Sequence, residues 1–278
     1  MQMPLLLTPE IEAVLAMQPL LLVNTSGGKD SEVIAHEIVT RYGSTHRIEF
    51  IYADTGWEYT TKAGKGGWAS TLDWNRQRVA SRGYDLHVVR NPHRTYLEEV
   101  RLRGKFPSPA QRWCTAHHKR APIQKWITGR PEPLIISIKG MRAEESPARA
   151  KMKPWEIDQT LTVKRAKSTG APRTVWTWLP IHAWPTDYIY TYCAEHNLPL
   201  HRVYRFLKRF SCQFCIMENA AGYAAIREHN PEAFATIAAL EAETGFTMNP
   251  KGTVSQIADS WTARQIEIAE KPTQACFF

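Results

Sequence analysis

Long apolar runs are missing from this chain of 278 residues, and no basic stretch precedes its first apolar segment. A membrane-spanning helix needs about 18 or more consecutive apolar residues, and a secretory signal begins with basic residues. The opening segment instead contains Glu10 and Glu12. We therefore expect no membrane partner, and we interpret the segment as a helix followed by a buried strand.

Cysteine is also scarce, with five residues in the whole chain. Five cysteines do not form a disulfide scaffold in a chain of this length, and no internal repeat is present. The close pair Cys212 and Cys215 is typical of metal or redox chemistry in a reducing compartment. We therefore expect a cytoplasmic protein.

Acidic residues are fewer than basic ones, 27 against 35, so the formal net charge is +8. Such a balance favours polyanionic partners, which include nucleic acids and small anionic nucleotides. Hydrophobic residues make up 43% and charged residues 22%, which excludes a disordered or fibrous class. The composition predicts a folded globular protein and is compatible with an oligomer.

Short apolar runs alternate with segments of helical spacing through the first half of the chain. The runs are 19–24, 48–52, 86–89 and 134–138, and helical segments follow the first, second and third of them. This alternation predicts an α/β fold, a doubly wound and mostly parallel sheet. Ligands bind such sheets at the carboxyl ends of the strands, so the loops after 19–24, 48–52 and 134–138 should converge on one crevice.

The domain organisation follows from where this alternation stops. Residues 1–220 are predicted as a nucleotide-binding α/β domain, and residues 221–278 as a helical C-terminal region. The stretch near 143–178 is rich in Lys, Arg, Pro and Thr. We interpret it as a basic, solvent-exposed loop that could act as a lid or contact a polyanion.

The turn after the first predicted strand has the sequence SGGKDS, from Ser26 to Ser31. A glycine-rich turn before a helix presents backbone N–H groups to an anion, and the helix N-terminus adds its positive dipole end. The Lys29 ammonium can neutralise phosphate charge, while Asp30 is also a favourable first-turn carboxylate. The G-x-x-x-x-G-K-[ST] spacing of a Walker loop is absent. The turn is therefore a candidate phosphate site of another kind.

This turn resembles the SGGxDS signature of PP-loop adenine-nucleotide α-hydrolases. Other segments narrow the resemblance to the phosphoadenosine phosphosulfate reductase family in the broad sense, which includes sulfonucleotide reductases and ATP-using DNA phosphorothioation proteins. The matching segments are YADTGWE (52–58), RWCTAHHKRAPI (112–123), KGMRAEESPAR (139–149), LPIHAW (179–184) and SCQFC (211–215).

The resemblance implies a sheet that binds ATP, or an adenylyl sulfonucleotide, with attack at or near the α-phosphate. It implies that Lys29, Asp30, Asp54 and Arg142 take part in catalysis, with Asp54 assisting Mg²⁺ or the ribose. The residues implied to bind the nucleotide are Ser26, Gly27, Gly28, Lys29, Asp30, Ser31, Gly140, Arg142 and Arg149.

The spacing of Cys212 and Cys215 suits zinc, an Fe–S cluster or a redox pair. The resemblance implies that Cys114 joins them around a [4Fe–4S] cluster, although Trp113 stands where cluster-bearing members have another cysteine. The fourth ligand is open. Cys193 or Cys276 could supply it, a substrate or another group could occupy the iron, or the metal could be zinc with His117 or His118. Cys193, on an amphipathic run, is more typical of a core residue.

The resemblance implies an enzyme that adenylylates an acceptor with ATP and lets sulfur from a donor, which could be a protein, replace the activated oxygen. The positive charge favours a nucleic-acid acceptor. Cluster-free reductases of the family use a cysteine in a Glu-Cys-Gly tail, whereas this chain ends QACFF. The alternatives are a sulfonucleotide reductase and a non-catalytic module that binds nucleotides or nucleic acid.

Overall fold

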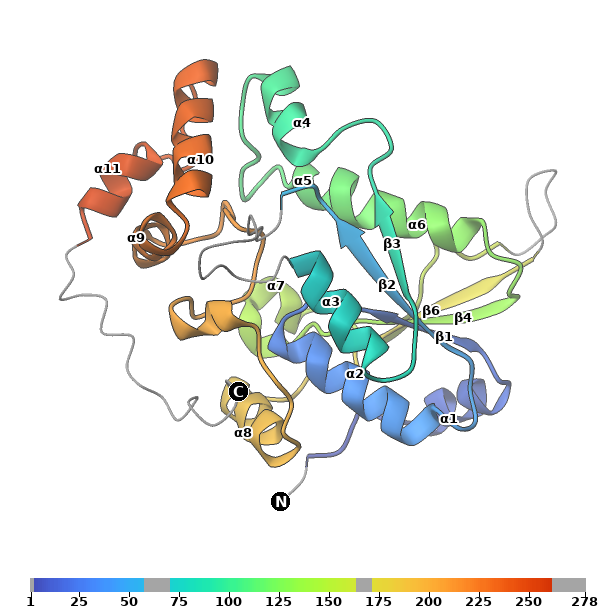
Figure 1. Cartoon of the computed structure of the whole chain (residues 1–278). Helices are drawn as coiled ribbons and strands as arrows, with labels where there is room; N and C mark the ends of the chain where they lie inside the picture. The colour runs from blue at the N-terminus through green and yellow to red at the C-terminus, as the bar shows by residue number, and fades with distance from the viewer. Residues whose placement is uncertain (1–2, 58–70, 164–171, 262–278) are drawn as a thin grey trace.

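A single six-stranded sheet organises the computed structural model, which describes residues 3–57, 71–163 and 172–261. The strand order is β3-β2-β1-β4-β6-β5, and every neighbouring pair is parallel except β5 with β6. The predicted α/β fold with a mostly parallel sheet is confirmed (Figure 1). The strands are β1 (Leu20–Asn24), β2 (Ile48–Asp54), β3 (Leu86–Arg90), β4 (Leu134–Ile138), β5 (Trp155–Ile157) and β6 (Thr174–Trp178).

Side chains of the central strands alternate between two apolar layers, as a sheet covered on both faces requires. Leu21 and Val23 of β1 pack in one cluster with helices α1 (Pro9–Ala16), α2 (Lys29–Tyr42) and α8 (Thr186–Glu195). Leu20 and Leu22 pack in the other cluster, which contains Ile127 of α6 (Ala121–Thr128). The sheet is therefore doubly wound, with apolar layers on both faces.

The remaining helices of the sheet region lie in the connections. They are α3 (Thr71–Ala80), α4 (Tyr96–Arg103), α5 (Trp113–Thr115), the π-helix η1 (Ala116–Arg120), η2 (Ala143–Glu145) and α7 (Pro147–Ala150). A π-helix is rare and often marks a functional site. Here it begins two residues after Cys114.

The stretch 143–178 is not the exposed loop that we predicted. It contains η2, α7 and two strands, and β6 pairs with β4 inside the sheet. The reason is that Thr174–Trp178 consists of β-branched and aromatic residues, which suit a strand, and that Val175 and Trp178 are fully buried. The prediction for residues 164–171 lies outside the described residues.

Helices follow the sheet, as predicted for the C-terminal region. A short helix η3 (Arg202–Arg205) precedes α9 (Ala220–His229), α10 (Pro231–Thr244) and α11 (Val254–Asp259). Asn219, Asn230 and Thr253 cap the last three by accepting backbone N–H groups, which fixes where each begins. These three helices stand together at one end of the molecule (Figure 1). The boundary at residue 220 stays a prediction.

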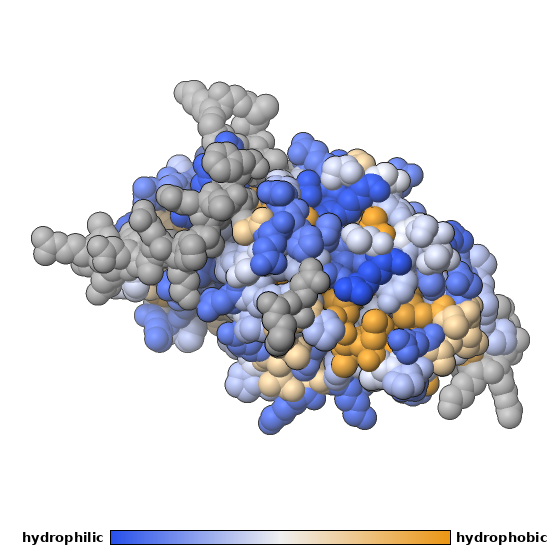
Figure 2. All heavy atoms as spheres, turned by 90° about the horizontal axis from the view of Figure 1, so that it is seen from below, coloured by the Kyte–Doolittle hydropathy of each residue, from blue (hydrophilic) through white to orange (hydrophobic). Residues whose placement is uncertain are grey.

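Hydrophilic residues cover much of the face seen from below, where α8 and the N-terminal segment lie in Figure 1, although an apolar area remains (Figure 2). Leu7 and Met17, at the two ends of α1, are among the exposed large hydrophobic residues. Within the described residues, no helix is both long and apolar enough to cross a membrane.

Candidate functional site

The SGGKDS turn connects the carboxyl end of β1 to the N-terminus of α2, so its backbone meets the positive end of the helix dipole. Gly27 has φ +84°, and a Cβ atom there would lie 3.0 Å from side-chain atoms of Trp74 and Asn75. The turn is also held internally, because the Ser31 hydroxyl donates to the Gly28 carbonyl at 2.8 Å. Glycine is therefore required at position 27 both for its conformation and for space.

Lys29 is the first residue of α2, and its side chain is buried. Its ammonium lies 3.1 Å from Asp30 Oδ2 and 5.6 Å from the ring centroid of Tyr190. A carboxylate and an aromatic face thus hold the cation at the SGGKDS turn, called the phosphate loop below, where it could contact an anionic ligand.

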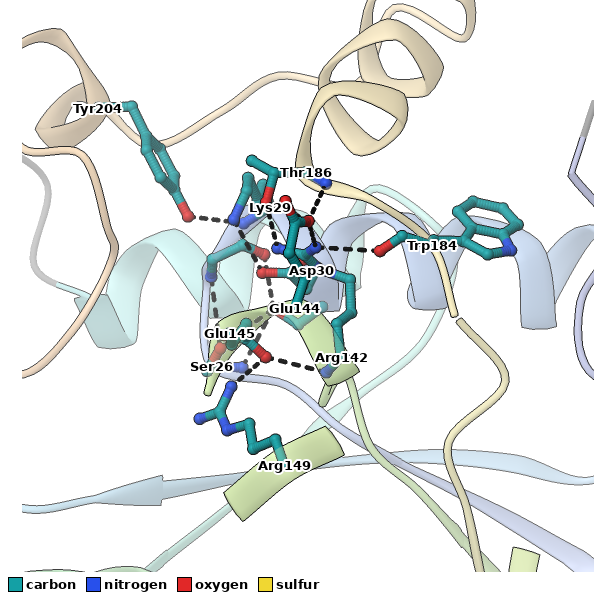
Figure 3. Close-up of polar contacts among 12 residues, drawn as sticks. Ser26, Lys29, Asp30, Arg142, Glu144, Glu145, Arg149, Trp184, Thr186 and Tyr204 are labelled. Atoms are coloured by element: carbon teal, nitrogen blue, oxygen red, sulfur yellow. Dashed lines mark hydrogen bonds and ion pairs between the residues drawn. The ribbon is translucent and has the colours of Figure 1, made fainter. Parts of the chain in front are cut away.

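Arg142 connects the phosphate loop to the loop after β4, and it is only 1% exposed. Its Nε donates to Asp30 Oδ1 at 2.5 Å, and its Nη atoms donate to Glu144, the Trp184 carbonyl and the Thr186 hydroxyl at 3.0–3.1 Å (Figure 3). Burial alone would lower the pKa of Arg142, but Asp30 above all raises it. The guanidinium therefore stays charged and orients Asp30.

Gly140 allows this close approach of the two loops. A Cβ atom on Gly140 would lie 3.2 Å from the backbone carbon of Asp30. Any larger residue would push the loop after β4 away from the N-terminus of α2. The structure thus brings together Lys29, Asp30, Gly140 and Arg142 from the residues predicted to form the nucleotide site.

Two predicted residues lie outside this network of direct contacts. Arg149 is ion-paired with Glu145, which also accepts the Arg142 backbone N–H at 2.9 Å, so it joins the network through one carboxylate (Figure 3). Asp54, at the end of β2, pairs with Arg90 at 2.7 Å and accepts the Gly56 N–H at 2.8 Å. Asp54 therefore lines a small cavity together with Arg90 and Arg94.

The three predicted metal ligands come together around Tyr96. Burial, and then the thiols of Cys114, Cys212 and Cys215, hold the pKa of Tyr96 well above its ordinary value. Burial likewise raises the pKa of the Cys114 thiol, and Cys215 adds to that shift. Cysteines almost 100 residues apart in the sequence therefore lie in the same part of the fold.

The other two cysteines are the thiols predicted as a possible fourth ligand. Cys193 is fully buried in the apolar core, as its amphipathic run predicted, and Cys276 lies outside the described residues. His117 and His118, the proposed zinc ligands, each bond Glu99 through one ring nitrogen, at 2.8 and 2.7 Å. In the described part of the chain, no three His, Cys, Asp or Glu side chains are arranged to hold one metal ion.

Sequence reasoning missed the cluster around Glu99, which also pairs with Arg103 at 2.8 Å. Burial would raise the pKa of Glu99, but hydrogen bonds from His117, Arg103 and His118 lower it. The Glu99–Arg103 pair has the i,i+4 spacing of a helical ion pair and could have been predicted. The histidines, 18 and 19 residues away, gave no local signal.

The site consists of a glycine-bearing turn between a central parallel strand and a buried helix N-terminus, and it holds a lysine and a carboxylate there. This arrangement is typical of the PP-loop nucleotide-binding class. Residues 20–209 match the model of the phosphoadenosine phosphosulfate reductase domain, and the chain belongs to this family. The resemblance of the sequence motifs to that family is thereby confirmed.

An uncharacterised protein of Methanocaldococcus jannaschii is 28% identical over 195 residues, which cover 70% of this chain and 35% of that protein. The chain thus spans about a third of the length of this relative.

Among solved structures, the phosphoadenylyl-sulfate reductase of Candida auris in a phosphate complex is 17% identical, with a TM-score of 0.46. The match covers 70% of this chain and 83% of the reductase. The U34-tRNA thiolase of Methanococcus maripaludis with its [4Fe–4S] cluster is 15% identical, with a TM-score of 0.43 and coverage of 94% and 77%.

Proposed function

We propose that this chain activates an oxygen of a nucleic-acid acceptor with ATP and replaces that oxygen by sulfur. The acceptor oxygen attacks the α-phosphorus, the bond between the α-phosphorus and its bridging oxygen breaks, and pyrophosphate leaves. A donor of the sulfide class then attacks the carbon that bears the adenylyl group. The carbon–oxygen bond breaks, and AMP leaves with the oxygen.

The observation that carries this proposal is that Cys114, Cys212 and Cys215 all lie near Tyr96, in the same molecule as the phosphate loop. The segment that contains Tyr204 and Cys212 connects the two regions. A phosphate loop supplies adenylylation, and thiolates bind a metal or sulfur. Neither feature alone requires the other. Their presence in one small fold favours nucleotide-driven sulfur chemistry.

The residues of the phosphate loop have distinct tasks in the first step. The N-terminus of α2 and the hydroxyls of Ser26 and Ser31 bind phosphoryl oxygens, and Lys29 neutralises charge that develops as pyrophosphate leaves. Arg142 orients the Asp30 carboxylate, whose other oxygen holds the Lys29 ammonium at the loop. Preorganised charges of this kind need no rearrangement at the moment of reaction.

The donors at the second site are thiols, which suit a [4Fe–4S] cluster. A zinc ion would need a fourth ligand around one point and is the alternative. A cluster instead distributes its thiolate ligands over different irons. Cys114, Cys212 and Cys215 would hold it, and when bound it would supply an iron that can bind sulfur.

Basic side chains around the three thiols support a nucleic-acid acceptor. Arg209 donates to Cys215 Sγ at 3.5 Å, and Lys119 lowers the pKa of Cys114 against the larger effect of burial. The Arg103 guanidinium lies 4.9 Å from the ring centroid of Trp113, and Arg112 is exposed beside it. Cations interleaved with an aromatic ring suit a phosphate backbone with unstacked bases.

The reaction is tested by incubating anaerobically prepared protein with ATP, Mg²⁺ and labelled sulfide, with bulk tRNA or double-stranded DNA in separate reactions. We expect pyrophosphate and AMP in equal amounts, dependent on one nucleic acid, with label entering that acceptor. Thioredoxin-dependent release of sulfite from an adenylyl sulfonucleotide, without cleavage of ATP, would instead establish a reductase and refute the proposal.

Replacing Cys114, Cys212 or Cys215 by serine is expected to remove most of the bound iron, because each thiolate would hold a different iron of the proposed cluster. Iron and sulfide analysis after anaerobic purification should give about four irons per chain in the unmodified protein. The matched control is Cys193→Ala, which should keep its iron because Cys193 lies in the core. Stoichiometric zinc in place of iron, or full iron content in Cys114→Ser, would contradict this assignment.

A further inference from the structure

Tyr204 occupies the phosphate loop in this structure. Its hydroxyl accepts the backbone N–H of Lys29 at 3.0 Å (Figure 3). That N–H is the first of α2, one of the groups at a helix N-terminus that have no partner within the helix and that bind anions. Tyr204 therefore satisfies from within the chain a donor that the proposed function assigns to a nucleotide.

Aromatic rings also cover the glycines of the loop. A Cβ atom on Gly28 would lie 3.2 Å from the Tyr204 hydroxyl oxygen and 3.3 Å from Phe210 Cβ. A Cβ atom on Gly27 would lie 3.3 Å from Phe210 Cζ. Trp74 adds a bond from its Nε1 to the Gly27 carbonyl at 3.1 Å. Side chains thus pack against the backbone that a phosphate would need to approach.

The chemical state of the phenol suits this role. Burial, and then the charge of Asp30, hold the pKa of Tyr204 well above its ordinary value. The group is therefore a neutral oxygen acceptor, which an anionic phosphoryl oxygen outcompetes for a backbone N–H at a helix N-terminus.

We propose that the Tyr204 hydroxyl stands where a phosphoryl oxygen of the nucleotide binds, and that nucleotide binding displaces Tyr204 together with the segment that leads to Cys212 and Cys215. Tyr204 belongs to η3, Phe210 follows six residues later, and Cys212 comes two residues after that. The rings of Tyr204 and Phe210 are 6.2 Å apart between centroids. Movement at the phosphate loop is thereby transmitted along a short, packed segment to the thiols.

This proposal rests on nucleotide binding at the phosphate loop, and the experiments distinguish its failure from failure of the proposed function. Binding of α,β-methylene ATP is measured by calorimetry for the unmodified chain and for Tyr204→Phe, which keeps the ring and removes the competing oxygen. We expect the variant to bind about 3–10-fold more tightly, because a closed state that must first open lowers apparent affinity. The matched control is Tyr188→Phe. In the unmodified chain the Tyr188 hydroxyl also accepts a backbone N–H, that of Met3, at 2.8 Å. Its affinity should not change.

A second measurement uses the unmodified chain alone and follows amide hydrogen exchange with and without the analogue. The Phe206 and Leu207 amides both bond the Val203 carbonyl, at 3.2 and 2.8 Å, so they report on whether η3 stays in place. We expect faster exchange over residues 202–215 and slower exchange over 26–31 when the analogue binds. Equal or weaker binding by Tyr204→Phe, or unchanged or slower exchange over 202–215, would overturn the inference. An unmodified chain that binds no adenine nucleotide would refute the proposed function itself.

Discussion

Replacing Arg142 by alanine is expected to lower the free energy of unfolding by about 3–5 kcal/mol, because it removes one partner of a buried ion pair. The guanidinium bonds Asp30, Glu144, Trp184 and Thr186 at once, and all of these would lose a donor. Urea denaturation followed by tryptophan fluorescence measures the loss. Arg142→Lys should recover only part of it, since one ammonium cannot reproduce a planar set of five donors.

The matched control for this prediction is Arg149→Ala, seven residues further along. Arg149 forms one ion pair, with Glu145, and its side chain is 36% exposed. Such exposed pairs contribute about 1 kcal/mol or less, so the loss should be correspondingly small. In Arg142→Ala the Asp30 carboxylate keeps Lys29 as its partner, so adding Asp30→Asn, which also removes the partner of the buried Lys29 ammonium, should not restore stability. If Arg142→Ala lowers the free energy of unfolding by less than about 1 kcal/mol, the buried Arg142 network does not stabilise the fold as we expect.

The parts of the fold and site that follow local patterns were predictable from the sequence. Strands β1, β2, β3 and β4 are short apolar runs, and the helices between them show helical spacing. The carboxyl-end rule for parallel sheets then placed the loop with Gly140 and Arg142 next to the phosphate loop. The close approach of Gly140 to Asp30 agrees with that expectation.

Other features depend on contacts between distant residues, which periodicity does not encode. Strand β6 begins just after a basic stretch, and its polar neighbours obscured a run of β-branched and aromatic residues. The bond between Lys29 and Tyr204 joins residues 175 positions apart. Asp54 is an intermediate case. Its partner Arg90 is its neighbour in the register of β2 with β3, so knowledge of strand order would have revealed the pair.

Replacing Lys29 by methionine is expected to slow the nucleic-acid-dependent release of pyrophosphate from ATP by about 10²–10³-fold. Cleavage places negative charge on the leaving pyrophosphate, and removing one preorganised group that stabilises such charge has effects of this size. Methionine is unbranched and apolar like the lysine stem, and it removes the ammonium that lies 5.6 Å from the Tyr190 and 5.9 Å from the Tyr204 ring centroid. Asp30 keeps Arg142 as its partner, so the fold should tolerate the change.

The measurement is a continuous assay of pyrophosphate under saturating ATP, together with urea denaturation to show that the variant is folded. Lys125→Met is the matched control, because Lys125 is an exposed lysine of α6 on the opposite side of the sheet from α2. It should keep its rate. In the proposed function the phosphate loop binds nucleotide through backbone N–H groups as well as Lys29, so binding of α,β-methylene ATP should weaken far less than turnover slows. A folded Lys29→Met variant with undiminished turnover would show that the loop positions phosphate without stabilising its cleavage, and the role of Lys29 in the reaction would have to be abandoned.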